Sequence, residues 1–187
     1  MAGDVLGVVL AAGGGSRMGR PKALVREADG TPWVEQAVRM LRAAGCTSVL
    51  VVLGADAETA RPLVPRDARI VVHPAWHEGL GSSVRAALEA AADATADAVL
   101  LTLVDLPGLP ASVGRRVLDA AADDPAASLA RAVFHGRPGH PVLIGRAHWA
   151  DLGAGLHGDE GAGAYLRAHG AAAVECGDLA DGLDRDR

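Results

Sequence analysis

The chain has 187 residues, of which half are hydrophobic, so it can build one packed domain and is not intrinsically disordered. Its formal net charge of -5 argues against a general nucleic-acid-binding protein, because such proteins carry a surplus of basic residues. The two cysteines form no C-x-x-C motif, and we expect reduced thiols in a cytoplasmic protein. Charged residues interrupt the apolar runs, so the sequence predicts neither a signal peptide nor a membrane span.

The hydrophobic pattern predicts alternating strands and helices along most of the chain. Short apolar runs predict strands over residues 5–10, 48–53, 68–72, 98–104, 128–134, 142–144 and 171–175. Helical spacing and capping signals predict helices over residues 32–44, 56–62, 83–92, 110–122 and 146–152, with a last one starting near residue 158. This order favours an α/β fold with a parallel sheet and helical crossovers. Residues 135–141 are a predicted rigid turn, and the tail 177–187 is expected to be mobile unless a ligand holds it.

The first predicted strand runs into a glycine loop, Gly13 to Gly15, which is followed by Arg17 and Lys22. Glycines let a ligand approach the main chain, and successive backbone N–H groups in such a loop bind anions. Lys22 is the only lysine in the sequence, which indicates that a compact point charge is needed at this position. The loop therefore predicts a phosphate site.

Two common phosphate motifs do not fit this loop. The P-loop needs Gly-Lys-Ser/Thr, but Gly19 is followed by Arg20 and Pro21. The dinucleotide fingerprint needs a third glycine, and Met18 occupies that position. The loop belongs to a third type of phosphate site.

Asp105 follows the most hydrophobic predicted strand. A carboxylate at the carboxyl end of a central parallel strand lies where open α/β sheets bind ligands, and an unpaired buried carboxylate is costly. A magnesium ion beside the phosphate site would be a suitable partner, so Asp105 is a predicted metal ligand. Ser82 is a second candidate: it is predicted to cap the helix that begins at Ser83, and a helix N-terminus can bind an anion.

With these residues in hand, the chain resembles a known family. Leu-Ala-Ala-Gly-x-x-x-Arg-Met-Gly-x-x-Lys at residues 10–22 is similar to the signature of GT-A type nucleotidyltransferases. Three further stretches, at residues 76–83, 104–107 and 139–142 followed by 158–162, resemble the molybdenum cofactor cytidylyltransferase family in the same order. The resemblance implies a Rossmann-like three-layer αβα fold with a mostly parallel central sheet. It implies one domain over residues 1–187, with a nucleotide-binding half at about 1–125 and an acceptor-binding half at about 126–187.

The resemblance also implies a reaction. A phosphate of the acceptor, molybdopterin in this family, attacks the α-phosphorus of a nucleoside triphosphate, and pyrophosphate leaves. Catalysis is mainly positioning and charge stabilisation, helped by Mg²⁺. The implied catalytic residues are Arg17, Lys22 and Asp105; the nucleotide-binding residues are Leu10, Ala11, Ala12, Gly13, Gly14, Gly15, His73, Ser82 and Ser83; the acceptor-binding residues are Gly139, His140 and Pro141; and the metal ligands are Asp105 and Asp184.

Guanylyltransferase relatives tend to carry glycine at the position of Ala12, and this difference favours CTP over GTP. Three departures from the family pattern keep alternatives open. Relatives carry a small amide at the position of His73 and an arginine at the position of Gly163, and their second metal ligand comes from a tail segment that Asp184 matches poorly. A transferase acting on a sugar or alditol phosphate, and a non-catalytic nucleotide-binding relative, are therefore the alternatives.

Overall fold

The computed structural model of the protein describes residues 3–15 and 18–185, and its centre is a seven-stranded sheet. The strand order is β3-β2-β1-β4-β6-β5-β7. The strands are β1 (Val5–Ala11), β2 (Ser48–Leu53), β3 (Arg69–Val72), β4 (Ala98–Leu103), β5 (Leu129–Phe134), β6 (Arg137–Gly145) and β7 (Ala172–Glu175). Only β6 among these strands runs antiparallel to its neighbours, β4 and β5. The predicted, mostly parallel sheet is confirmed.

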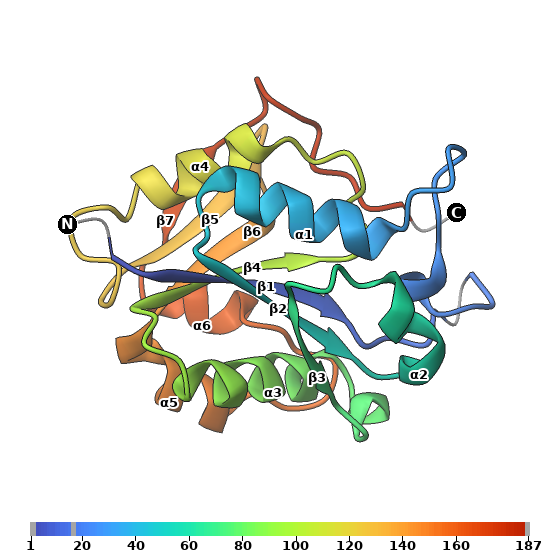
Figure 1. Ribbon diagram of the computed structural model, residues 1–187. Helices are drawn as coiled ribbons and strands as arrows, with labels where there is room; N and C mark the ends of the chain where they lie inside the picture. Colours follow the sequence, from blue (N-terminus) through green and yellow to red (C-terminus); the bar gives the residue numbers. More distant parts are fainter. Residues whose placement is uncertain (1–2, 16–17, 186–187) are drawn as a thin grey trace.

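Helices cover both faces of the sheet (Figure 1). On one face lie α1 (Trp33–Ala44) and α4 (Ala111–Asp119), and on the other lie α3 (Leu80–Ala92), α5 (Trp149–Gly155) and α6 (Gly163–Ala168). The short helix α2 (Ala57–Ala60) follows β2. The three-layer αβα architecture is therefore confirmed. In the described ranges, no helix is both long and apolar enough to span a bilayer.

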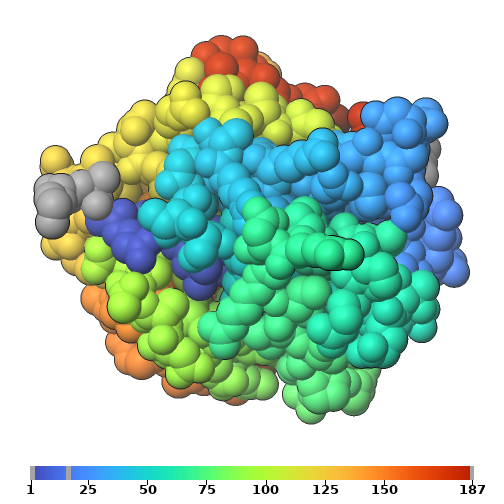
Figure 2. Space-filling model, viewed as in Figure 1, coloured from blue at the N-terminus to red at the C-terminus, as the bar shows by residue number. Residues whose placement is uncertain are grey.

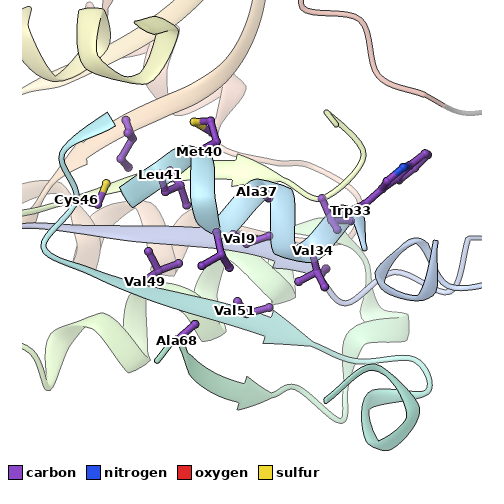
Figure 3. Packing of buried hydrophobic residues seen from close by; sticks show 14 of the residues in the cluster. Val9, Trp33, Val34, Ala37, Met40, Leu41, Cys46, Val49, Val51 and Ala68 are labelled. Carbon is purple, nitrogen blue, oxygen red and sulfur yellow. The ribbon is translucent and has the colours of Figure 1, made fainter. Parts of the chain in front are cut away.

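Burial on both faces explains why the strands are continuous apolar runs. Along β1, Val9 belongs to the cluster under α1 and α4, whereas Val8 belongs to the cluster under α3. Figure 3 shows Val9 and Val49 of the sheet pointing toward Leu41 of α1. A Cβ on Gly7 would lie 3.0 Å from the Leu41 Cβ, so glycine lets α1 pack closely on β1. The position of α1 in turn places the loop between β1 and α1.

The region after β5 differs from the predicted turn over residues 135–141. The turn consists of His135 and Gly136, whose φ angles of 51° and 75° suit a two-residue hairpin. β6 starts directly afterwards, at Arg137, and continues to Gly145. Proline is compatible with a strand at an irregularity, and the register between β5 and β6 shifts between Arg131 and Val133. Gly139, His140 and Pro141 therefore lie on a bulged strand, and the peptide bond before Pro141 is cis.

The start of α3 also differs from the prediction. α3 begins at Leu80, and its N-cap residue is Gly79, which has a φ of 104°. Ser82 consequently lies in the first turn and is not the N-cap residue. Its hydroxyl donates a hydrogen bond of 2.7 Å to the Gly79 carbonyl, and this bond closes the turn.

The tail after β7 folds back along the protein. Arg116 of α4 holds Asp178 with two hydrogen bonds of 2.5 and 2.9 Å. The backbone N–H of Arg185 donates a 2.9 Å hydrogen bond to the carbonyl of Asp105. Figure 2 shows the tail at the surface beside α4. The described end of the chain is thereby attached next to the carboxyl end of β4.

Truncating Leu41 tests the packing of α1 on the sheet. Leu41 is fully buried, and Leu41→Ala should lower the free energy of unfolding by about 2–5 kcal/mol because it leaves a cavity. Urea denaturation followed by circular dichroism measures this change. The control is Val72→Ala on the edge strand, where the side chain is 40% exposed and the expected loss is below about 1 kcal/mol. Equal losses in the two variants would contradict the described core.

Candidate active site

The candidate site is a cleft at the carboxyl ends of β1 and β4. These strands are parallel neighbours with Leu10 opposite Leu103, so the loops that follow them emerge side by side. The loop before α3 closes a third side. The cleft has a volume of about 580 Å³ and is lined by Leu10, Ala11, Ala12, Gly13, Gly14, Gly15, Lys22, Trp76, His77, Gly79, Leu80, Ser83, Leu103, Val104, Asp105 and Asp159. Most of the residues predicted for nucleotide binding are therefore brought together.

The three glycines of the loop differ in what a side chain at each position would meet. Gly15 has a φ of +64°, and a Cβ there would lie 1.9 Å from the Arg20 carbonyl oxygen, so no side chain fits. A Cβ on Gly14 would lie 3.0 Å from the Trp76 ring, so the indole packs against the main chain of the loop. A Cβ on Gly13 would meet nothing within 4 Å. Gly13 therefore leaves the main chain open to the cleft, as a phosphate site requires.

Lys22 and Asp105 meet in the cleft. The Lys22 Nζ lies 2.6 Å from the Asp105 Oδ2, although the two residues are 83 positions apart in the chain. The side chains are 22% and 10% exposed, so the ion pair is largely shielded from water. The predicted catalytic lysine and the predicted metal ligand thus neutralise each other.

The second oxygen of Asp105 bears on metal binding. Asp105 Oδ1 is buried and has no hydrogen-bond partner among residues 3–15 and 18–185. One carboxylate oxygen without a partner, beside a phosphate loop, suits Mg²⁺, which binds through one or two carboxylates together with substrate phosphates and water. No group of three or more potential side-chain ligands is found in the described ranges. One or two carboxylates are the number that Mg²⁺ usually takes from a protein beside a phosphate substrate.

The predicted second metal ligand, Asp184, is exposed. It is next to Arg185, whose backbone bonds to the Asp105 carbonyl and whose side chain pairs with Glu27 at 2.9 Å. These two contacts hold the tail beside the Asp105 loop. Asp184 remains a predicted ligand. Arg17, the remaining predicted catalytic residue, lies outside the described residues.

Only some of the residues predicted to face the base and ribose line the cleft. Ser83 lines the cleft, whereas His73 and Ser82 are absent from its lining. The His73 Nε2 lies 2.9 Å from the Ser82 hydroxyl oxygen, and Ser82 is buried. His73 and Ser82 therefore support the start of α3 from behind the cleft wall.

The predicted acceptor-binding stretch is absent from the cleft lining. Gly139, His140 and Pro141 lie on β6, and the Gly139 carbonyl accepts a 3.0 Å hydrogen bond from the Arg131 Nε. Burial, with a smaller effect of Arg131, lowers the pKa of His140 to about 4. The imidazole is consequently neutral at pH 7.

Sequence reasoning assigned no binding role to Trp76, Leu80 and Asp159, which also line the cleft. Their loops interlock: the Gly81 N–H donates a 2.9 Å hydrogen bond to the Gly158 carbonyl, and a Cβ on Gly79 would lie 2.4 Å from the same carbonyl. The available signal was the glycine spacing in residues 76–83 and 158–162, because close approach of two main chains requires glycine.

Comparison with known proteins is consistent with this geometry. The family model described as "MobA-like NTP transferase domain" matches residues 7–174. The chain is 36% identical to nicotine blue oxidoreductase of Paenarthrobacter nicotinovorans over 190 residues, covering 97% of this chain and 92% of that protein.

Solved structures show the same fold. A homologue of Mycobacterium tuberculosis Rv0371c from Mycobacterium sp. strain JC1 superposes with a TM-score of 0.83 at 32% identity, covering 97% of this chain and 90% of that chain. Rv0371c from M. tuberculosis H37Rv in complex with manganese gives a TM-score of 0.73 at 27% identity, covering 94% and 88%. CMP:2-keto-3-deoxy-manno-octonic acid synthetase complexed with CTP, at 17% identity and a TM-score of 0.74 over 98% of this chain and 93% of that chain, shares the fold.

A double-mutant cycle tests the Lys22–Asp105 pair. Lys22→Ala leaves a largely buried carboxylate without its cation and should cost about 1–3 kcal/mol of unfolding free energy. Asp105→Asn removes the charge, so adding Lys22→Ala to that variant should cost less. The measurement is urea denaturation of the four proteins, with an expected coupling of about 1 kcal/mol or more. Additive losses would show that the two side chains do not interact in solution.

Proposed function

Because the chain belongs to the MobA-like NTP transferase domain family, we propose that it transfers CMP from CTP to the phosphate of molybdopterin and releases pyrophosphate. The observation that carries the proposal is the meeting of the glycine loop, Lys22 and Asp105 in one cleft at the carboxyl ends of β1 and β4. The three features supply a phosphate cradle, a cation and a carboxylate, which are the groups that phosphoryl transfer requires.

The residues have distinct roles in this proposal. The N–H groups of Gly13 to Gly15 bind the β- and γ-phosphates, as in other main-chain anion sites. Lys22, assisted by Arg17, neutralises the α-phosphate and the departing pyrophosphate. When the triphosphate enters, its oxygens join Asp105 as acceptors for the Lys22 ammonium group. The ion pair therefore holds Lys22 at the position where negative charge develops during the reaction.

Asp105 is the proposed ligand of Mg²⁺, and Asp184 from the attached tail is the proposed second ligand. The orphaned Asp105 Oδ1 supports this assignment, as does the manganese complex of Rv0371c. A bound ion would neutralise charge on the phosphates and hold them for in-line attack. The protein's own contribution is a buried carboxylate whose orientation is fixed by Lys22 and by its position after β4.

Binding of the two substrates is assigned to different parts of the chain. We assign the nucleotide to residues at about 1–125, with Ala11, Ala12 and Ser83 facing the base and ribose. Ala12 supports CTP over GTP. The acceptor is assigned to residues at about 126–187, including the stretch Gly139, His140 and Pro141 on β6. A sugar or alditol phosphate is the alternative acceptor.

A redox enzyme is the second candidate function. The observation that favours it is the 36% identity, along nearly the whole chain, to a protein named nicotine blue oxidoreductase. The Lys22–Asp105 pair is compatible with it, because a carboxylate already neutralised by a lysine has less need of a metal. A non-catalytic nucleotide-binding role is the remaining alternative.

Pyrophosphate release separates these functions. The purified protein is incubated with each nucleoside triphosphate, Mg²⁺, and molybdopterin or a set of sugar and alditol phosphates. We expect Mg²⁺-dependent release that is fastest with CTP and molybdopterin. Nucleotide binding without pyrophosphate release in the presence of any of these acceptors would contradict a transferase. Oxidation of a reduced nicotinamide dinucleotide by nicotine blue, followed by absorbance, would establish the redox candidate.

Substitution of Lys22 tests its chemical role. Lys22→Ala should lower kcat by about two to three orders of magnitude, because it removes a charge that stabilises the transition state. The rate is measured at a temperature where circular dichroism shows the variant to be folded. The matched control is Arg39→Gln, which removes an exposed cation from α1 and should leave the rate unchanged. A Lys22→Ala enzyme with the parental rate would refute the assignment.

A further inference from the structure

Two guanidinium groups converge beside Gly163. A Cβ placed on Gly163 would lie 3.6 Å from the Arg167 Nη1 and 3.8 Å from the Arg131 Nη1. Arg131 comes from the middle of β5, whereas Arg167 lies one turn after Gly163 on α6. Two like charges from separate elements are therefore gathered around a position that has no side chain.

The positive charge of this cluster is not neutralised by the described protein. Neither Arg131 nor Arg167 forms an ion pair within residues 3–15 and 18–185. Among the residues that the structure describes, Arg131 donates one side-chain hydrogen bond, from its Nε to the neutral Gly139 carbonyl. Burial, and secondly the charge of Arg167, lower the pKa of Arg131, yet a guanidinium group stays protonated at neutral pH. A half-buried Arg131 guanidinium group that lies close to a second cation and has no counter-charge is costly, and an anion would relieve that cost.

His140 adds a neutral polar group to the cluster. It follows Gly139, to which Arg131 is bonded, and its imidazole is uncharged because burial and Arg131 lower its pKa to about 4. A neutral imidazole offers a ligand one N–H donor and one acceptor without further repulsion between cations. The cluster thus presents two charged planar donors and one neutral donor.

The cluster lies near the carboxyl end of β4, on the side of the sheet toward the cleft. The last registered pair between β4 and β6 is Leu101 and Val142. Leu103, which lines the cleft, comes two residues later on β4, and His140 comes two residues earlier on the antiparallel β6. Arg131 of β5 is also paired with Val142 of β6. A ligand held by the arginines could therefore extend toward the glycine loop and Lys22.

We propose that Arg131 and Arg167, with His140, bind the phosphate monoester of the acceptor. The proposal rests on the transferase function for the identity of the ligand. A guanidinium group presents paired N–H donors that match phosphate oxygens, and two such groups suit a dianion better than a single carboxylate. This arrangement would hold the acceptor phosphate on the β5 and α6 side of the cleft while the nucleotide occupies the β1 side.

Nuclear magnetic resonance of the arginine side chains tests the site without requiring turnover. The wild-type protein is titrated with inorganic phosphate and, at equal ionic strength, with acetate. We expect the Nε–Hε signals of Arg131 and Arg167 to shift with phosphate at concentrations where acetate has little effect. Shifts confined to the glycine loop would overturn the proposal, as would equal responses to the two anions.

Steady-state kinetics then tests the role of the site in the reaction. Arg167 is exposed, so Arg167→Gln should fold normally; Arg131→Lys retains the half-buried charge but loses the planar donor pair. Each variant should raise the KM for the acceptor by about tenfold and leave the KM for CTP unchanged. The control is Arg39→Gln on α1, which should change neither constant.

The outcomes distinguish the two proposals. Unchanged acceptor KM in both variants would overturn the phosphate site even if the transferase reaction is established. Phosphate-dependent shifts at Arg131 and Arg167 in a protein that turns over no acceptor would support the anion site and count against the transferase.

Discussion

The ion pair between Lys22 and Asp105 is the contact on which the candidate site depends. It joins the loop after β1 to the end of β4 across 83 positions of sequence, and both side chains are largely buried. A buried carboxylate needs a cation nearby, and a lysine side chain needs a partner that fixes its position beside the phosphate loop. One bond of 2.6 Å meets both needs, and it joins the two loops.

The sheet makes this contact possible. Because β1 and β4 are parallel neighbours in register, their loops emerge at one edge, where open α/β sheets bind ligands. Gly7 allows α1 to pack closely on β1, and the hydrogen bond between Arg185 and Asp105 attaches the tail to the same edge. The parallel pairing of β1 and β4 therefore contributes both to the packing of the fold and to the geometry of the cleft.

Much of this could be predicted from the sequence. The strands were recognisable because both faces of the sheet are buried, which makes them continuous apolar runs. The glycine loop and Lys22 were recognisable because they combine unusual residues in one short stretch, and the structure brings Asp105 to them.

Other features depend on contacts between distant segments and could not be predicted. The sequence predicted Asp105 near the glycine loop as a metal ligand, but it did not predict the direct ion pair with Lys22. Residues 135–141 suggested a turn because they are rich in proline and glycine, but the pairing of Arg137 and Pro138 with β5 outweighs that local preference. The approach of Arg131 to Arg167 depends on how α6 packs beside β5, which no local pattern encodes.

The most direct test of the account is a crystal structure with Mg²⁺ and a non-hydrolysable CTP analogue. The account predicts that the β- and γ-phosphates lie on the main chain of Gly13 to Gly15. It also predicts that Lys22 Nζ is within hydrogen-bond distance of a phosphate oxygen and that Asp105 Oδ1 binds the metal. A nucleotide bound outside the cleft, or Lys22 bonded to Asp105 with no phosphate contact, would contradict it.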